Sequence, residues 1–309
     1  MGKYVTAAEA VQVVKSGDRV YVQAAAATPT ILTKALADRA SELRNVEVCH
    51  LHTEGDAPYA NPELAESFHV NSFFIGANVR HTLKAGNGSY TPVFLSELPL
   101  LFRKNVVKLD VAFIHVSPPD SHGYCSLGVS VEASVAAIEN AKIVIAQVNP
   151  QMPRTFGDGI LHVSEIDYLV EVNVPIYAHD VTPFTAEEEK IGTYVASLIE
   201  NKSTLQMGIG SIPNAALSKL TNHKDLGLHT EMFSDGVIDL IENDVINCNY
   251  KGTLRGRALA TFLMGSKRLY DFVDDNPFIE MKESSMVNDT ARIRRNPRMV
   301  AINSAIEVD

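Results

Sequence analysis

The chain has 309 residues, 46% of them hydrophobic and 21% charged, with a formal net charge of −10 at pH 7. This is the composition of a globular protein with room for one large domain or two ordinary ones, and its acidity argues against recognition of a nucleic-acid backbone. Neither a basic-then-apolar leader nor an apolar run of the roughly 18 residues that span a bilayer is present, so we expect a cytoplasmic protein with no nucleic-acid or membrane partner.

Short β-branched apolar runs alternate with amphipathic stretches along the whole chain. The apolar runs predict buried strands over residues 20–24, 46–50, 111–116, 143–148, 205–208, 226–229, 258–263 and 299–303. Helical spacing predicts helices over residues 7–15, 31–39, 131–140, 191–200 and 215–220. Alternation of strand and helix indicates an α/β fold with mainly parallel sheets.

A weak internal repeat divides the chain into two halves. In each half a strand is followed by a loop, a proline (Pro29 or Pro213) and a helix, and the next strand ends in His-Thr-Glu, at residues 52–54 and 229–231. Any two βα units resemble each other, but we favour two similar α/β domains, residues 1–185 and 186–309. Prolines and the acidic run at residues 187–189 predict a linker between them.

The segment after strand 205–208 is rich in glycine and leads into a helix. Glycine allows positive φ angles and close approach to the backbone, and a helix N-terminus presents unpaired N–H groups. Such a loop can bind a phosphate or donate hydrogen bonds to a developing oxyanion, although an ordinary turn between strand and helix would have the same pattern. The spacing matches neither a dinucleotide-binding motif nor a P-loop. The candidate binding residues are Gly208, Ile209, Gly210, Ser211 and Ile212.

Glu231 follows the next strand and is the candidate catalytic residue. The carboxyl ends of parallel strands share one edge of a sheet, so we expect Glu231 and the glycine loop at the same edge, on neighbouring strands. A carboxylate beside N–H donors can act as a general base or as a nucleophile toward an acyl group. The alternative for a glutamate considered alone is a capping or solvated side chain.

Other residues with reactive side chains are weaker candidates. Glu54 ends the first His-Thr-Glu but has no companion glycine loop, so Glu231 is favoured over it. Cys125 could suggest a thiol nucleophile, but no activating context is readable around it, and a buried structural thiol is expected. The cysteines and histidines lack the spacing of zinc ligands or of a disulfide framework. We therefore expect no metal and no permanently bound cofactor.

The glycine segment at residues 208–214, the His-Thr-Glu at 229–231 and the Ser-Asp-Gly at 234–236 resemble the acetyl-CoA hydrolase/transferase family. Within that family the resemblance is to the 4-hydroxybutyrate and butyryl-CoA:acetate CoA-transferases. It extends over almost the whole chain, with further ordered matches at residues 8–11, 16–20, 110–120, 162–167, 262–272 and 302–303.

The resemblance implies that Glu231 is the nucleophile of a ping-pong reaction that passes through a mixed anhydride and a glutamyl-CoA thioester. It also implies that the loop at residues 208–212 lies against CoA, with an amide contributed by Ile209. Asn288 matches the family's CoA-contacting asparagine, although Asp289 and Thr290 follow it where histidine and proline are commoner.

We therefore predict a CoA-transferase whose active site lies between two domains and whose partners are substrates: a short acyl-CoA such as acetyl-CoA, and a short carboxylate such as 4-hydroxybutyrate, butyrate or acetate. The alternatives are an acetyl-CoA hydrolase and a non-catalytic subunit that binds CoA or another ligand. The resemblance also implies a homo-oligomer. It further implies a longer second domain, so we expect this chain's second domain to be cut short; the sequence leaves open whether the isolated chain is active.

Overall fold

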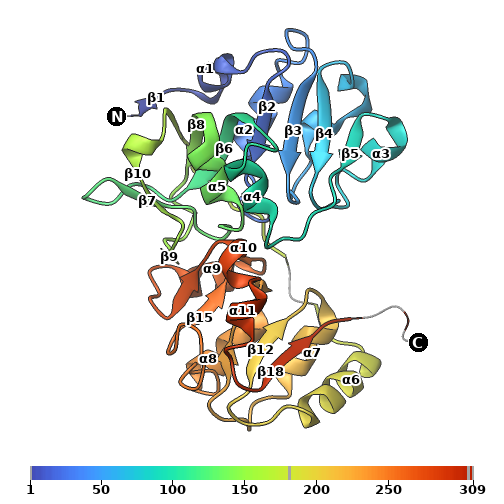
Figure 1. Cartoon of the computed structure of the whole chain (residues 1–309), viewed down its shortest axis with the longest axis vertical. Coiled ribbons are helices and arrows are strands. Elements are labelled where there is room, and N and C mark those ends of the chain that lie inside the picture. Colours follow the sequence, from blue (N-terminus) through green and yellow to red (C-terminus); the bar gives the residue numbers. More distant parts are fainter. Residues whose placement is uncertain (1, 180–181, 305–306, 308–309) are drawn as a thin grey trace.

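The computed structural model describes residues 2–179, 182–304 and 307. It has two α/β domains stacked along the long axis of the molecule (Figure 1). In the first domain, eight parallel strands form one sheet. In spatial order they are β1 (Lys3–Tyr4), β11 (Tyr168–Glu171), β8 (Ala141–Val148), β6 (Leu109–Val116), β2 (Arg19–Val22), β3 (Val46–His50), β4 (Phe68–Ser72) and β5 (Gly88–Tyr90).

The central strands β6 and β8 are apolar over residues 111–114 and 143–146, because helices cover both faces of the sheet. Helices α1 (Ala7–Ala10) and α2 (Thr30–Ala37) bury their apolar residues against one face. Helices α4 (Leu98–Arg103) and α5 (Ser134–Asn140) pack on the other face. The remaining elements of this half are helix α3 (His81–Ala85), the antiparallel pair β7 (Tyr124–Ser126) and β10 (Ile160–His162), and strand β9 (Phe156–Gly157).

The second domain is built on shorter parallel strands. One group runs in the order β13 (Gly227–Leu228), β12 (Thr204–Met207), β18 (Met299–Ile302), and another in the order β15 (Ala258–Ala260), β17 (Ile279–Met281), β9. A parallel bridge between His229 and Leu259 joins β13 to β15. A separate parallel pair consists of β14 (Met232–Phe233) and β16 (Phe262–Leu263).

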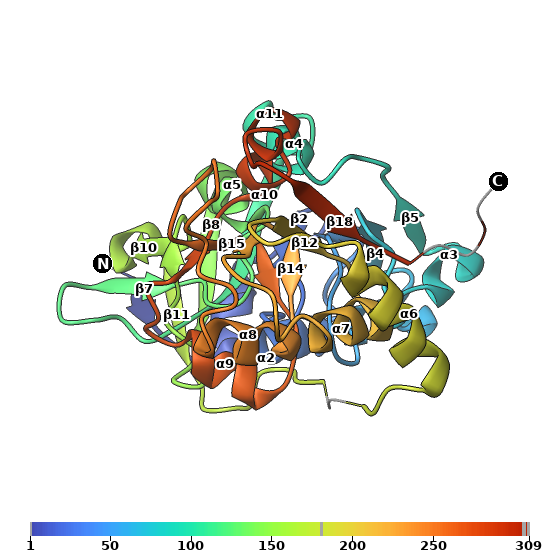
Figure 2. The ribbon, with the colours of Figure 1, turned by 90° about the horizontal axis from the view of Figure 1, so that it is seen from below.

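Helices of the second domain lie on both sides of these strands. They are α6 (Ala186–Ser197), α7 (Ser211–Ser218), α8 (Ile238–Glu242), α9 (Lys267–Val273), α10 (Ser284–Val287) and α11 (Thr290–Ile293). Figure 2 shows α7, α8 and α9 along one side of the molecule together with α2, and α10 and α11 on the other side with α4 and α5. The part of the chain that the structure describes has no helix long and apolar enough to cross a membrane.

The mainly parallel α/β architecture is confirmed, and the two halves share a strand order. In the first sheet β2 lies between β6 and β3, with β4 and β5 beyond β3; in the second, β12 lies between β18 and β13, with β15 and β17 beyond β13. The repeat read from the sequence therefore corresponds to a repeated supersecondary unit. The division at residues 185 and 186 stays a prediction.

Several predicted elements have other bounds in the structure, and three of the differences have clear local causes. The acidic run at residues 187–189, read as linker, forms the first turn of α6, where Thr185 and Glu188 make a capping box and negative charge favours the helix N-terminus. The strand predicted over residues 258–263 breaks at Thr261 into β15 and β16, because the N–H groups of Thr261 and Phe262 both donate to the Glu231 carbonyl. The glycine-loop helix begins at Ser211, before the predicted residue 215.

Gly157 in strand β9 joins the chain of the first half to the second sheet and gives a test of that junction. Its φ is +120°, and a Cβ built there would lie 1.9 Å from the carbonyl oxygen of Met281. We expect Gly157→Ala to lower the free energy of unfolding by about 3 kcal/mol, since backbone strain and overlap combine, as measured by urea unfolding followed by circular dichroism.

Gly86→Ala is the matched control. Gly86 also has a positive φ, +81°, but nothing lies within 4 Å of its added Cβ, so the backbone penalty alone, about 1 kcal/mol, is expected. Equal losses in the two variants would contradict a close β9–β17 junction.

Candidate functional site

The glycine loop is held tightly at its first residue and is open at the next two. The Gly208 N–H donates to the Ile302 carbonyl at 2.8 Å, and a Cβ on Gly208 would lie 2.9 Å from that oxygen. Gly210 has a φ of +122° and a ψ of −178°, a conformation essentially restricted to glycine. Both glycines are therefore required by the backbone, the first by close approach and the second by its dihedral angles.

The predicted set of backbone donors in this loop needs correction. Gly208 cannot donate to a ligand, because its N–H already completes the sheet with Ile302. The N–H groups of Ile209 and Gly210 have no acceptor among the described residues. Ser211 and Ile212 belong to the first turn of α7, and the Ser211 hydroxyl donates to Glu188 on α6. The open donors thus begin at Ile209 and Gly210 and continue into the first turn of α7, where the N–H groups have no partner within the helix.

Thr230 ties the glycine loop to the segment that carries Glu231. Its Oγ1 accepts from the Met207 N–H at 2.9 Å and lies 2.8 Å from the Met232 carbonyl oxygen, to which it donates. Met207 is the last residue of β12, directly before the loop. A buried hydroxyl therefore fixes the end of one strand to the bend that follows its neighbour, which places Glu231 and the loop on adjacent strand ends, as expected.

Glu231 lies in the bend between β13 and β14, with its side chain largely buried. The Asn288 side-chain amide donates to Glu231 Oε2 at 2.9 Å. Burial raises the pKa of Glu231 because it penalises the charged form, and the Asn288 amide lowers that pKa because it stabilises the carboxylate. Burial has the larger effect, so the pKa of Glu231 lies above its ordinary value. The two residues thus form a desolvated carboxylate with one fixed hydrogen-bond donor.

The amide oxygen of Asn288 supplies a further feature of this pair. Asn288 Oδ1 is buried and has no hydrogen-bond partner among the described residues. An orphaned buried acceptor costs about 1–3 kcal/mol, so a ligand N–H group at this position would stabilise the site.

His229 links the strand of Glu231 to the segment of Asn288. Its Nε2 lies 2.7 Å from the Val287 carbonyl oxygen, which can only accept, and its Nδ1 lies 2.8 Å from the side-chain nitrogen of Asn296. Burial lowers the pKa of His229, so the neutral ring donates through Nε2 and accepts through Nδ1. The imidazole thereby fixes the residue that directly precedes Asn288.

Lys251 is a buried cation that holds two strands of the site together. Its Nζ donates to the Leu228 carbonyl at 2.7 Å and to the Arg257 carbonyl at 2.6 Å. Leu228 ends β13 and Arg257 directly precedes β15. Burial lowers the pKa of Lys251 to about 8. The ammonium group therefore connects neighbouring strands just before the bend that carries Glu231.

A cavity of about 460 Å³ opens beside the glycine loop. Its walls include Gly208, Ile209, Gly210 and Ser211 from the loop, with Met232 and Ser234 from the segment after Glu231. Glu231, Asn288 and Ile212 are not part of its lining. The structure thus gathers four predicted binding residues at one cavity and pairs Glu231 with Asn288 nearby, with Thr230 connecting the two groups.

The weaker candidates lie in different environments. Glu54 is half-buried, burial raises its pKa, and its Oε1 lies 3.8 Å from Nε2 of His179, a residue that lines the cavity. Cys125 is buried, and burial raises the pKa of its thiol to about 11, so the thiolate is scarce at neutral pH. Among the residues that the structure describes, no group of three or more His, Cys, Asp or Glu side chains is arranged to hold a metal.

Sequence reasoning did not find the residues that support Glu231. His229 was part of the motif, but its ring contacts residues 58 and 67 positions away, and no local pattern reveals such partners. Lys251 carried one available signal, a lysine between two apolar strands. Asn296 carried none.

Comparison with known families matches both ends of the chain. Residues 1–178 match the acetyl-CoA hydrolase/transferase N-terminal domain, and residues 265–309 match the acetyl-CoA hydrolase/transferase C-terminal domain. These matches agree with the resemblance read from the motifs.

Three relatives indicate how far the similarity extends. The chain is 45% identical over 298 residues to a succinyl-CoA:acetate/propanoyl-CoA:succinate CoA transferase of Fasciola hepatica, covering 96% of this chain and 62% of the relative. It is 44% identical over 308 residues to the 4-hydroxybutyrate coenzyme A transferase of Clostridium kluyveri, covering 99% and 72%. A crystal structure of 4-hydroxybutyrate CoA-transferase from Porphyromonas gingivalis matches with a TM-score of 0.88 at 39% identity, covering 99% of this chain and 74% of that one.

The chain therefore spans less than two thirds of the first relative and about three quarters of the solved structure. The expected truncation of the second domain stays a prediction. Matches over both halves, with 44% identity along nearly the whole chain, decide the classification: the chain belongs to the acetyl-CoA hydrolase/transferase family.

Proposed function

We propose that the chain acts as a CoA-transferase, moving CoA from a short acyl-CoA to a short carboxylate, with Glu231 as the nucleophile. The observation that carries this proposal is the partly buried Glu231 carboxylate, bound by one amide donor and adjacent to a loop with unpaired N–H groups. Family membership supports the reaction class, since relatives with 44–45% identity are named as CoA transferases.

The proposed reaction begins when a Glu231 carboxylate oxygen attacks the thioester carbonyl carbon. The carbon–sulfur bond breaks, and a mixed anhydride and CoA thiolate result. The thiolate sulfur then attacks the glutamyl carbonyl carbon, the anhydride carbon–oxygen bond breaks, and the first carboxylate leaves. The acceptor carboxylate reverses these steps on the glutamyl-CoA thioester, so every bond is exchanged without an external energy source.

Burial and hydrogen bonding of Glu231 have opposing effects that suit this chemistry. A carboxylate removed from water is more reactive because less solvation must be lost in the transition state. The Asn288 amide favours the ionised form and fixes one oxygen, which leaves the other oxygen for attack. In this proposal the N–H groups of Ile209 and Gly210 stabilise the tetrahedral oxyanion, a contribution of about 3 kcal/mol per donor in other acyl-transfer enzymes.

For the substrates we propose acetyl-CoA or another short acyl-CoA as donor and 4-hydroxybutyrate, butyrate or acetate as acceptor. The name of the Clostridium relative supports 4-hydroxybutyrate. Hydrolysis of acetyl-CoA is the second candidate, because water could replace the acceptor carboxylate at the same site. The cytoplasmic location and the homo-oligomeric state stay predictions.

The covalent step can be tested by trapping. After incubation with acetyl-CoA, borohydride should reduce the glutamyl thioester to an alcohol, and peptide mapping by mass spectrometry should locate the change at Glu231 and not at Glu54. Glu231→Gln should show no trapped product and should lose activity by at least about a thousandfold, since an amide is a poor nucleophile. Modification confined to another carboxylate would overturn the assignment.

Transfer and hydrolysis are separated by their products. With acetyl-CoA and butyrate or 4-hydroxybutyrate, a transferase forms a new acyl-CoA and acetate while free thiol stays constant. Mass spectrometry of the CoA esters and a thiol reagent measure the two quantities together, with Glu231→Gln as the control. Release of one free thiol per acetyl-CoA consumed, with no new ester, would favour the hydrolase.

The pH dependence of the reaction follows from the environment of Glu231. Attack requires the ionised form, so activity falls as pH decreases through a pKa that burial has raised above its ordinary value. Asn288 stabilises the carboxylate, and Asn288→Ala should therefore move the acidic limb of kcat/KM to still higher pH. Asn249→Ala, at an exposed position, should leave that limb in place. An unchanged limb in the Asn288 variant would contradict the role of the amide.

A further inference from the structure

Helix α10 carries Asn288 to Glu231 and begins at the contact between the two domains. It contains only four residues, Ser284–Val287, and Asn288 is its C-terminal cap. A helix this short makes few bonds of its own, so contacts at its two ends determine its position. Those contacts come from different domains.

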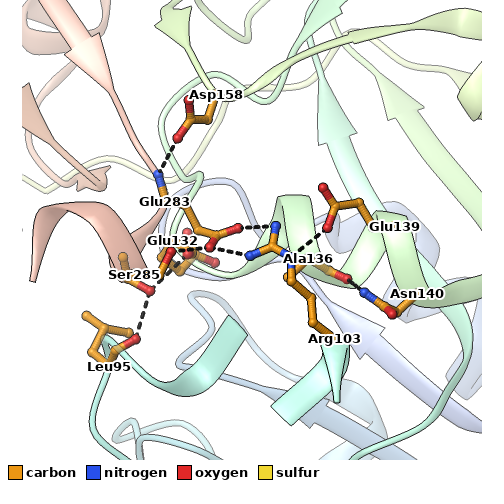
Figure 3. A network of polar contacts seen from close by, with 10 residues as sticks. Leu95, Arg103, Glu132, Ala136, Glu139, Asn140, Asp158, Glu283 and Ser285 are labelled. Atoms are coloured by element: carbon orange, nitrogen blue, oxygen red, sulfur yellow. Dashed lines mark hydrogen bonds and ion pairs between the residues drawn. The ribbon is translucent and has the colours of Figure 1, made fainter. Parts of the chain in front are cut away.

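The residue before α10 is held by the first domain through an ion pair. Arg103, the last residue of α4, donates from Nη1 to Glu283 Oε1 at 2.6 Å and from Nη2 to Glu283 Oε2 at 2.7 Å. The Glu283 side chain is only 6% exposed. Figure 3 shows the guanidinium facing this carboxylate, with Glu139 of α5 on its other side. A bidentate, partly buried pair fixes both distance and orientation.

The first residue of α10 is also bound to the first domain. The Ser284 N–H donates to the Glu132 carbonyl at 2.9 Å, and its hydroxyl lies 2.8 Å from the Leu95 carbonyl and 3.0 Å from the Glu132 carbonyl. The N–H of Glu283 donates to Asp158 at 3.1 Å. The start of α10 is therefore attached to three separate segments of the first half of the chain.

These contacts continue without a break to Glu231. The Asn288 N–H donates to the Ser284 carbonyl at 2.9 Å. The position of Ser284, at the start of the helix, therefore determines the position of Asn288, the cap residue at its end. His229 donates a hydrogen bond to the Val287 carbonyl, and the Asn288 side-chain amide donates to the Glu231 carboxylate. A displacement of Glu283 therefore moves the donor that orients the carboxylate.

We propose that Arg103 is a positioning residue for Glu231, acting from the first domain through Glu283, helix α10 and Asn288. The proposal rests on the function assigned to Glu231 above. According to this proposal, the Glu231–Asn288 hydrogen bond is correctly formed only when Arg103 binds Glu283. Docking of the two domains and orientation of the Glu231 carboxylate for attack are therefore coupled. Arg103 itself touches neither substrate nor reacting atoms.

Arg103 forms two ion pairs, one with Glu283 and one with Glu139, and removing each of them separately gives a test variant and a matched control. Glu283→Gln and Arg103→Met each remove the interdomain ion pair, and the glutamine variant leaves no buried charge behind. Glu139→Gln removes the other ion pair, which is half exposed and does not touch α10. Circular dichroism and urea unfolding establish that each variant is folded.

Two measurements test the proposal, and one does not depend on turnover. Carbodiimide with an amine labels protonated carboxyl groups, and peptide mass spectrometry across a pH series gives the titration midpoint of Glu231. Burial and the Asn288 amide set this midpoint. Burial also lowers the pKa of His229, so its ring stays neutral over the pH series and adds no charge near Glu231. Steady-state kinetics give kcat and KM separately for the full chain with acetyl-CoA and butyrate.

We expect Glu283→Gln and Arg103→Met to raise the labelling midpoint of Glu231 and to lower kcat about tenfold with KM within about twofold, while Glu139→Gln changes neither. Unchanged labelling and kcat in a folded Glu283→Gln variant would overturn the proposal. A shifted midpoint in a chain without transferase activity would support the positioning role and contradict the proposed function, so the two failures are distinguishable.

Discussion

The hydrogen bond between Asn288 and Glu231 is the interaction on which the rest of the site depends. It joins two segments that are 57 residues apart at the edge of a parallel sheet. Glu231 is partly buried, and a hydrogen-bond donor aimed at its carboxylate offsets part of the solvation lost there. The elements around it, from β13 to α10, are arranged so that this single donor reaches it.

The backbone of Glu231, the proposed nucleophile, also shapes the fold around it. Its carbonyl accepts the N–H groups of both Thr261 and Phe262, at 2.9 and 3.2 Å. Two successive N–H groups cannot point the same way in a regular strand, because successive residues alternate. The segment therefore breaks there into β15 and β16, and the bend that carries the Glu231 side chain is matched by a bend in the neighbouring strand.

The parts of the site that follow from local sequence could be predicted, and the parts that follow from distant contacts could not. Glycines at 208 and 210, and a glutamate after the next strand, indicate one sheet edge because strand and helix alternate locally. That the Gly208 N–H is already bonded to Ile302 depends on β18, about ninety residues later in the chain, and reverses its predicted availability. The bond from Arg103 to Glu283 spans 180 positions and leaves no periodicity to read.

The same distinction explains why the repeat in the chain does not give two equivalent sites. Both halves place His-Thr-Glu after the strand that neighbours the first strand of the repeat, at Glu54 and Glu231. At Glu231 the repeat is completed by a glycine loop, by Asn288 and by α10, which the first domain anchors. Glu54 instead faces His179 from the connecting segment. Two copies of one supersecondary unit thus differ around their carboxylates, because long-range contacts place an amide donor on Glu231 and an imidazole ring beside Glu54.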